Sequence, residues 1–365
     1  MNQSETLRFM KRTLILASRG AGTTHPNPMV GALVVSGGRI VGEGWHKMPG
    51  ESHAEAMALK EAGPAARGGV LYVNLEPCDH TGRTPPCTRT IIDAGISEVF
   101  AACQDPHPLV DGKGFDTLRK AGVRVTTGTL SQEAEELNRA FIHFSRTGTP
   151  YVTLKLASTL DGCIAAPDGN SKWITGEKAR KVVHRLRAQV DAVLVGVGTV
   201  IADDPKLTAR GVGRKIQPLR IILDPTLRTP PASRILNDNQ DGSTFLVIGD
   251  SVPESLSETF EDRGVHILRL PLRGGVFDWN TLAGALSGMG VLHVLVEGGG
   301  ETAARMLKEK AVNRLELFLA PKIFGASGIP LVGDMGATSL NEAAPLSFNR
   351  TRRVGEDVQI TADIK

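Results

Sequence analysis

The chain of 365 residues has little of three features that mark specialised classes of protein. It has four cysteines, too few for a disulfide scaffold at this length, which fits a reducing cytoplasm. Its formal net charge is only +3, which argues against a nucleic-acid binder that relies on bulk electrostatics. No run approaches the roughly 18 consecutive apolar residues that a membrane span needs, and residues 1–18 predict an amphipathic helix rather than a signal peptide.

The composition is that of a globular protein, with 41% hydrophobic and 22% charged residues. The length exceeds the size at which one core usually divides, so we expect two domains. Strand-like and helix-like patterns alternate throughout, which predicts an α/β fold in both. The turn-forming stretch 146–150 is a compact break and places the domains at residues 1–147 and 150–365.

The same patterns predict individual elements. In the first domain, Ser131 is expected to be the N-cap of one long helix over 131–145. Other predicted helices cover 7–18, 53–62, 87–94 and 116–121, and predicted strands cover 29–35, 39–45, 70–75, 99–103 and 123–127. In the second domain, predicted strands cover 151–156, 192–197, 219–223, 245–248, 291–296 and 315–319, with helices at 178–189, 282–287 and 302–310.

One histidine and two cysteines have the pattern of a catalytic zinc site. His53 stands two residues before Glu55, and Pro77 directly precedes Cys78, with Cys87 nine positions further on. Three protein ligands plus a water molecule form the usual catalytic zinc arrangement. The general signature of zinc deaminases is H-x-E followed by P-C-x-x-C, with the glutamate as proton carrier. Here eight residues separate the cysteines instead of two, and the predicted chemistry is hydrolytic removal of an amino group from a ring.

Plainer interpretations of these residues remain open. His53 could be a helix cap with the cysteines in the core, or a structural zinc could take His46 or His80 as its fourth ligand. Asn27, in a rigid turn before a predicted strand, could contact a ring or ribose or could serve only the turn.

In the second domain, Gly298–Gly300 lie between a predicted strand and a predicted helix. Such a turn lets main-chain amides approach a pyrophosphate, or it is simply a tight turn. The pair Gly196 and Gly198 also follows a strand, but Ile201 replaces the third glycine of a Rossmann fingerprint, which we therefore exclude.

Several polar side chains of this domain are candidates for contacts with a phosphorylated ligand. Ser171, Arg187 and Arg210 could donate to a phosphate, although the local sequence alone favours surface charges for both arginines. Asp203 and Glu297 could contact a ribose or a ring nitrogen. Lys155 stands inside an apolar predicted strand and therefore needs a polar partner or a site.

Read together, the motifs make a specific resemblance visible. Residues 27–32, His53-Ala54-Glu55, and Glu76-Pro77-Cys78 followed by His80, Gly82, Thr84, Pro85, Pro86 and Cys87 resemble the deaminase domain of the bifunctional riboflavin-biosynthesis deaminase/reductases. Independently, segments 151–155, 158–162, 173–176, 186–188, 203–210 and 297–300 are similar to the reductase domain of that family. The resemblance covers nearly the whole chain.

The resemblance implies a cytidine-deaminase-like three-layer α/β/α domain, followed by a dihydrofolate-reductase-like α/β domain. It implies zinc held by His53, Cys78 and Cys87 with Glu55 catalytic, and a second reaction that uses NADPH. Cofactor contacts are implied for Ser158, Trp173, Thr199, Asp203, Gly298, Gly299 and Gly300. Substrate contacts are implied for Asn27, Lys155, Ser171, Arg187, Leu207, Arg210 and Glu297.

We therefore expect a small pyrimidine ribosyl phosphate as substrate, deaminated first and then reduced at its ribose. We expect no nucleic-acid or membrane partner, and a homo-oligomer, either dimer or tetramer. Two rival functions stay open: a single-activity base or nucleoside deaminase with a non-catalytic second domain, and a non-enzymatic zinc-stabilised binding module. A lack of NADPH binding would favour the first, and a zinc with four protein ligands the second.

Overall fold

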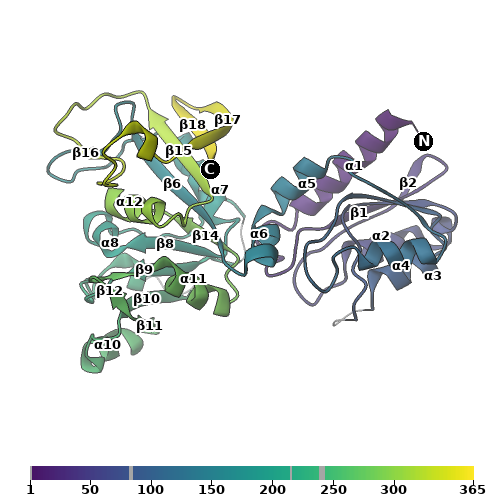
Figure 1. Cartoon of the computed structure of the whole chain (residues 1–365), viewed down its shortest axis with the longest axis horizontal. Helices are drawn as coiled ribbons and strands as arrows, with labels where there is room; N and C mark the ends of the chain where they lie inside the picture. Colours follow the sequence, from purple (N-terminus) through teal and green to yellow (C-terminus); the bar gives the residue numbers. More distant parts are fainter. Residues whose placement is uncertain (1, 82–84, 214–215, 238–242) are drawn as a thin grey trace. The chain divides into compact units, whose positions relative to one another are not determined.

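The computed structural model describes residues 2–81, 85–213, 216–237 and 243–365 (Figure 1). Gly82 and Thr84, which contribute to the family resemblance, lie outside the described residues. The chain divides into two compact units, Met1–Gly148 and Thr149–Lys365, and each is described by itself. Within the described parts of the chain, no helix is both long and apolar enough to cross a lipid bilayer.

The first unit is built on a mixed five-stranded sheet with the strand order β2-β1-β3-β4-β5. β1 (Gly31–Ser36) is antiparallel to β2 (Arg39–Trp45) and to β3 (Val70–Leu75). β3, β4 (Glu98–Cys103) and β5 (Arg124–Thr127) run parallel. The predicted hairpin is confirmed: Gly37 and Gly38 both have positive φ values, 55° and 75°, which two-residue hairpin turns require.

Helices cover both faces of this sheet, which confirms the three-layer α/β/α prediction (Figure 1). Helices α2 (Ala54–Ala62), α3 (Cys87–Asp93) and α4 (Lys113–Lys120) bury their apolar residues on one face, where the short 3-10 turn η1 (Gly63–Ala66) also packs. On the other face, α1 (Gln3–Ser18) and α5 (Ser131–Leu137) pack against Tyr72 and Leu33. Helix α6 (Arg139–Thr147) follows α5.

The prediction of one helix over 131–145 is wrong, because the helix breaks at Asn138. The buried Asn138 side chain accepts a hydrogen bond from Met29 N at 2.8 Å and donates to Met29 O at 2.9 Å. These bonds satisfy irregular main chain just before β1, which outweighs continuation of the helix. Ser131 is not the N-cap either: Leu130 holds that position in a left-handed conformation with no side-chain cap.

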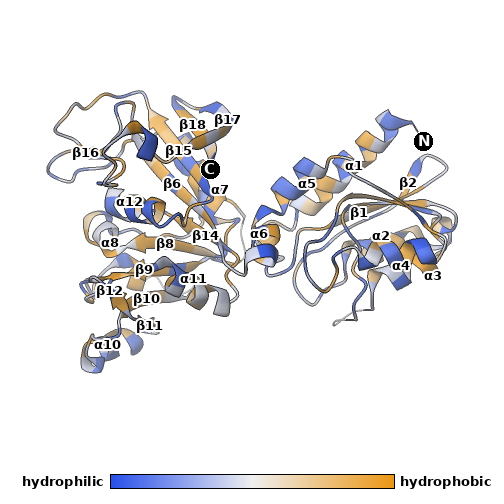
Figure 2. Cartoon of the chain, viewed as in Figure 1, coloured by the Kyte–Doolittle hydropathy of each residue, from blue (hydrophilic) through white to orange (hydrophobic). Residues whose placement is uncertain are grey.

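The second unit contains a nine-stranded sheet with the order β11-β10-β9-β8-β14-β6-β15-β18-β17. Its first seven strands are parallel, and β18 and β17 add an antiparallel hairpin at one edge. The strands are β6 (Tyr151–Thr159), β8 (Ala192–Gly196), β9 (Leu219–Leu223), β10 (Thr244–Gly249), β11 (His266–Leu270), β14 (His293–Val296), β15 (Arg314–Ala320), β17 (Leu346–Val354) and β18 (Asp357–Ile364). Figure 2 shows the central strands β6, β8, β9 and β10 as strongly hydrophobic, as expected of parallel strands covered on both faces.

Helices also cover both faces of the larger sheet. Helices α11 (Trp279–Gly288) and α12 (Gly300–Lys308) pack on one face. Helices α7 (Glu177–Arg187), α8 (Val197–Asp203), α9 (Arg234–Asn237) and α10 (Glu254–Glu261) pack on the other. The remaining elements are short: β7 (Cys163–Ala165), β12 (Leu272–Arg273), β13 (Val276–Phe277), β16 (Ile329–Pro330) and η2 (Leu340–Glu342). The predicted strand at 291–296 begins at His293, and α8, α9, α10, β11, β17 and β18 were not predicted as elements.

Candidate functional sites

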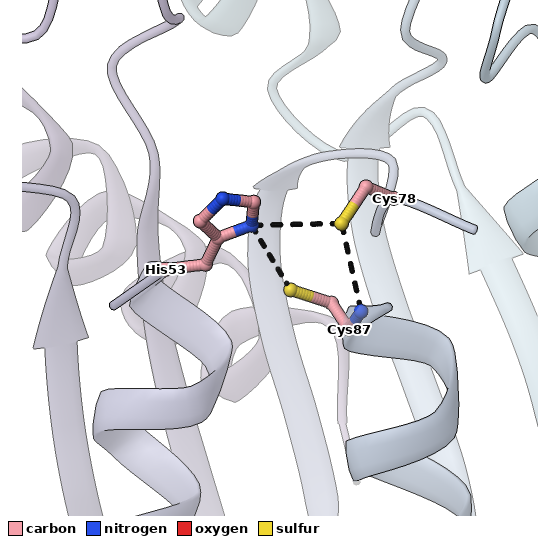
Figure 3. A group of neighbouring side chains, drawn as sticks. All are labelled: His53, Cys78 and Cys87. Carbon is pink, nitrogen blue, oxygen red and sulfur yellow. Dashed lines mark hydrogen bonds between the residues drawn. The ribbon is translucent and has the colours of Figure 1, made fainter. Parts of the chain in front are cut away.

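His53, Cys78 and Cys87 converge in the first unit from three separate elements (Figure 3). His53 Nδ1 lies 3.2 Å from Cys87 Sγ and 3.5 Å from Cys78 Sγ. All three possible ligand atoms lie within 4.8 Å of one another. A tetrahedral zinc ion with ordinary bond lengths needs ligand atoms about 3.6 Å apart, so the triangle already has the size of a zinc site.

The three side chains occupy these positions because of where each secondary element ends. His53 is the N-cap of α2, and its imidazole makes no capping hydrogen bond, so the ring is free for the site. Cys87 is the first residue of α3, and Cys78 lies in the loop after β3. The main-chain N–H of Cys87 also points at Cys78, 3.5 Å from its sulfur. Helix N-termini stabilise a neighbouring thiolate, the form that binds zinc.

Hydrogen bonds among His53, Cys78 and Cys87 shift the pKa values of all three groups. The hydrogen bond between Cys78 and Cys87 lowers the pKa of Cys78 and raises that of Cys87. A hydrogen bond to Cys78 raises the pKa of His53. Two soft sulfurs and one imidazole are zinc ligands by chemistry, and they fit that ion. Among the described residues, no other group of three such side chains could hold a metal ion.

Glu55 lies in the first turn of α2 and is 3% exposed. Burial, helped by the negative charge on Cys78, raises the pKa of Glu55 to about 7. A carboxyl group with such a pKa can hold a proton and release it near neutral pH, which suits a general acid and base. Glu55 hydrogen-bonds with Cys87 but is not one of the three grouped ligand residues.

A structural zinc with four protein ligands finds no support in the described residues. The buried His46 is outside the ligand triangle: its Nε2 pairs with Asn27 Nδ2 at 3.0 Å, and its ring meets the His53 ring edge-on at 5.5 Å. His80 is exposed and is also outside the triangle. Asn27 is therefore held by His46, whose ring in turn contacts the ring of His53.

In the second unit, Glu297 is the centre of a buried charge cluster just beyond β14. Arg187 donates from Nε to Glu297 Oε1 and from Nη2 to Glu297 Oε2, the second bond at 2.9 Å. Lys155 Nζ lies 3.8 Å from Glu297 Oε2. The side chains of Arg187, Glu297 and Lys155 are 12%, 9% and 17% exposed. Lys155 thus has the polar partner that its apolar strand required, and Arg187 is not a surface charge.

The charged groups of this cluster shift one another's pKa values. Burial opposes the charge on Glu297, but Arg187 and Lys155 outweigh it and hold the pKa of Glu297 at about 2. Burial lowers the pKa of Lys155, with Glu297 acting in the opposite direction. The ordered ammonium and carboxylate are suited to orient a polar ligand.

The predicted phosphate and ribose contacts gather at one end of the parallel sheet. Helix α8 begins directly after β8, and Asp203 at its end accepts a hydrogen bond from Ser171 Oγ at 2.7 Å. Lys172 Nζ donates to Asp203 O at 3.0 Å. Arg210 is exposed, and its side chain donates to Thr208 Oγ1 at 2.6 Å. The loop that carries Ser171 is therefore tied to α8.

The glycine-rich turn leads into α12, with Gly299 as N-cap and no capping side chain. A side chain at Gly300 would come within 2.8 Å of Pro330 O, so the main chain there needs glycine. Thr199 Oγ1, from α8, lies beside Gly299. Two helix N-termini after neighbouring parallel strands therefore face one region, a frequent location for phosphate binding.

The other predicted contacts differ in accessibility. Trp173 is 65% exposed, with the Arg180 guanidinium 4.5 Å from its ring centre. Ser158 is fully buried and donates to Thr159 O, so its hydroxyl is occupied within the chain. Leu207 has its side chain in the core, with φ at 53°, so any contact with a ligand has to come from its main chain.

Comparison with known proteins bears on both units. The family model for the cytidine and deoxycytidylate deaminase zinc-binding region matches residues 3–103, and that for the RibD C-terminal domain matches residues 150–360. The riboflavin biosynthesis protein RibD of Aquifex aeolicus is 46% identical over 352 residues, 96% of either chain. The chain belongs to the RibD family. RibD of Escherichia coli is 41% identical over 96% of this chain and 97% of its own length.

Solved structures of the RibD family extend the likeness to three dimensions. Acinetobacter baumannii RibD covers 100% of both chains with 34% identity and a TM-score of 0.89. A diaminohydroxyphosphoribosylaminopyrimidine deaminase/5-amino-6-(5-phosphoribosylamino)uracil reductase from Thermotoga maritima covers 99% of both chains, with 34% identity and a TM-score of 0.88. The resemblance drawn from the motifs is thereby confirmed for the whole chain.

The sequence reasoning gave no role to two residues that flank Cys78, although one of them, Glu76, belongs to the motif. Glu76 and Asp79 stand on either side of Pro77-Cys78, and both bind groups on neighbouring helices. The sequence shows only that two carboxylates flank a candidate ligand. Their bonds to α3 and α4 become visible only in the fold.

Proposed function

We propose that this chain is a bifunctional enzyme of riboflavin biosynthesis. Residues 1–147 would remove the ring amino group of 2,5-diamino-6-(5-phosphoribosylamino)pyrimidin-4-one by hydrolysis. Residues 150–365 would then reduce the ribosyl group to ribityl with NADPH, giving 5-amino-6-(5-phosphoribitylamino)uracil. The observation that carries the proposal is the His53, Cys78 and Cys87 triangle beside the buried Glu55, in a chain of the RibD family.

In the first reaction, His53, Cys78 and Cys87 would hold zinc, which supplies a Lewis acid for activating water. Glu55 would take a proton from the attacking water and deliver it to the ring nitrogen, and would then carry the remaining hydroxyl proton of the adduct to the departing amino group, which leaves as ammonia. Its pKa of about 7 lets it act in both directions at neutral pH. Asn27, held by His46, would orient the ring or ribose through its amide.

In the second reaction, NADPH supplies the hydride, and this chain binds and aligns the two reactants. The turn Gly298–Gly300, together with Thr199 and Trp173, would hold the cofactor, with Asp203 completing its site. Lys155 and Glu297 would orient the pyrimidine. Ser171 and Arg210 would bind the phosphate, with Arg187 fixing Glu297 and Leu207 contributing main chain.

The decisive experiment assays the purified full-length chain with the diaminopyrimidine ribosyl phosphate, with and without NADPH. We expect ammonia release without NADPH, and NADPH oxidation only after deamination. Ammonia release with no NADPH oxidation under any condition would contradict the reductase half and favour a single-activity deaminase. Zinc without ammonia release would favour a binding module.

We also propose a homo-oligomer, either dimer or tetramer, located in the cytoplasm. The edge strand β17 is exposed along most of its nine residues, with Phe348 69% exposed and Leu346 39% exposed. A nine-residue edge strand that exposes two apolar side chains among its polar ones favours association with a second copy. The two thiolates that would bind zinc also need a reducing compartment. Light scattering of wild type and Phe348→Glu tests the assembly, and a monomeric wild type would contradict it.

A further inference from the structure

Asp79 connects the loop after Cys78 to two helices. Its Oδ1 accepts a hydrogen bond from Thr88 Oγ1 at 2.6 Å, and its Oδ2 accepts one from Thr117 Oγ1 at 2.8 Å. Thr88 is the second residue of α3, directly after Cys87, and is 1% exposed. Thr117 lies in α4. The carboxylate of Asp79, which follows Cys78, is thus hydrogen-bonded to Thr88, which follows Cys87.

Glu76 fixes the other side of Cys78. Its carboxylate accepts main-chain hydrogen bonds from Gly114 at 2.9 Å, Gly112 at 3.0 Å, Asp105 at 3.2 Å and Phe115 at 3.3 Å. These bonds hold the segment before the cysteine against the start of α4. Glu76 therefore fixes the loop relative to α4, whereas Asp79 is the only one of the two carboxylates bonded to a side chain of α3.

The need for such a connection follows from the long interval between the two cysteines. In a C-x-x-C turn, two intervening residues keep the thiolates close together. Here eight residues intervene, and the cost of bringing the ends of a flexible segment together grows with its length. The main chain contributes bonds from Cys87 N to Cys78 Sγ, at 3.5 Å, and from Thr88 N to Cys78 O, at 3.2 Å.

The bonds to Asp79 are stronger than these main-chain contacts. Hydrogen bonds from hydroxyl groups to a carboxylate are charge-assisted and short. Residues that orient metal ligands typically change metal affinity by roughly 10–100-fold when they are lost. Asp79 is not one of the ligand atoms, so its effect has to act through the positions of Cys78 and Cys87.

We propose that Asp79 is a positioning residue of the zinc site. Its hydrogen bonds to Thr88 of α3 and Thr117 of α4 fix the loop after Cys78 and so set the separation of Cys78 and Cys87. The inference rests on the proposed zinc-dependent deaminase. It predicts that the apo protein of an Asp79 variant folds but binds zinc more weakly. The loss of affinity should depend on the two threonine hydroxyls.

The test compares full-length Asp79→Ala, Asp79→Asn and wild type in zinc competition against a chelator of known affinity. We expect about 10–100-fold weaker zinc binding for Asp79→Ala. Asp79→Asn should recover most of the affinity, because its amide can accept from one threonine hydroxyl and donate to the other. Asp93→Ala is the matched control: Asp93 is also an acid near this site, at the end of α3, but its carboxylate is exposed and pairs with Arg89.

Three further measurements separate positioning from folding. Thr88→Val and Thr117→Val remove the donors without touching Asp79, and each should weaken zinc binding while adding little to Asp79→Ala. NADPH oxidation with pre-deaminated substrate should be unchanged in every variant. The unfolding temperature of the zinc-free protein should fall less than that of the zinc-loaded protein, whereas a purely structural role lowers both equally.

Zinc affinity of Asp79→Ala within twofold of wild type would overturn the inference, as would equal losses in both unfolding temperatures. Neither result would affect the proposed deaminase, provided that wild type binds zinc and releases ammonia. Conversely, a wild-type chain that binds no zinc would contradict the proposed function itself.

Discussion

The buried charge cluster of the second unit allows a quantitative prediction for Glu297→Gln. The glutamine keeps the shape of the side chain but removes the charge that Arg187 and Lys155 share. Both cations then remain in a largely buried site without the charge of Glu297. Because removing one partner of a buried ion pair leaves the other uncompensated, the substitution should destabilise the second unit strongly.

The loss in free energy of unfolding that Glu297→Gln should cause follows from two quantities. The difference between an ordinary glutamate pKa of 4.5 and a folded-state pKa of about 2 corresponds to about 3 kcal/mol of stability at neutral pH. Breaking a buried pair by removing one partner costs roughly 3–5 kcal/mol. We therefore expect Glu297→Gln to lower the free energy of unfolding of the second unit by about 3 kcal/mol at pH 7.

The pH dependence follows from the direction of the shift. The pKa of Glu297 is lower in the folded chain than in the unfolded one, so the unfolded chain binds more protons as the pH falls. Its contribution is complete above the ordinary pKa of 4.5 and is lost as the pH drops towards 2. The difference between wild type and Glu297→Gln should consequently be smaller at pH 3.5 than at pH 7.

The assay is urea unfolding of the full chain in a Trp45→Phe background. The chain has three tryptophans, and the remaining two, Trp173 and Trp279, both lie in the second unit, so fluorescence follows that unit alone. Glu258→Gln, an exposed change on α10, is the control and should have almost no effect. Equal stabilities of wild type and Glu297→Gln at pH 7, or a difference that does not shrink on acidification, would refute the reasoning.

Three further predictions concern the first unit. Glu55→Gln should slow ammonia release by roughly 100-fold or more while NADPH oxidation with pre-deaminated substrate continues, and unchanged ammonia release would exclude the proton-carrier role. Removing zinc with a chelator should abolish ammonia release but leave the far-ultraviolet circular dichroism intact, and added zinc should restore activity. Asn138→Ala should lower the stability of the first unit by about 1–3 kcal/mol, since Met29 N loses its partner; the measurement is urea unfolding in a Trp173→Phe, Trp279→Phe background, in which Trp45 is the remaining tryptophan. Asn138→Asp keeps that acceptor but places a carboxylate oxygen against Met29 O in a buried site, so it should not recover the lost stability.

Much of the fold could be predicted because local pattern and tertiary structure agree. The strand β3 and the strand β9 occupy the residues expected from their apolar runs. The prediction fails where a side chain serves a distant part of the chain: Asn138 breaks a well-patterned helix because it binds main chain 109 positions away. The strands β17 and β18 were missed because β17 is polar and exposed, so it carries no buried-strand signal.

The candidate metal site could be located from sequence because its ligands are rare residue types at informative spacing. The second site could not be located in the same way, because its residues are common types that only the fold brings together. Arg187 and Glu297 are 110 positions apart and form a buried pair. Without the fold, Arg187 is indistinguishable from an arginine on a helix surface. The family resemblance names both residues as substrate contacts, but only the structure shows that Arg187 and Glu297 bind each other.

The long interval between the cysteines has a physical consequence that its sequence alone does not reveal. A short C-x-x-C turn combines two tasks, since it supplies both ligands and also holds them together. In this chain the tasks are separated: Cys78 and Cys87 supply the sulfurs, whereas Glu76 and Asp79 fix the intervening loop to α3 and α4. The separation makes the positions of the ligands depend on Asp79 and Glu76 more than on the other residues near Cys78. Substitutions within that interval should therefore alter substrate handling before zinc affinity, with Asp79 as the exception.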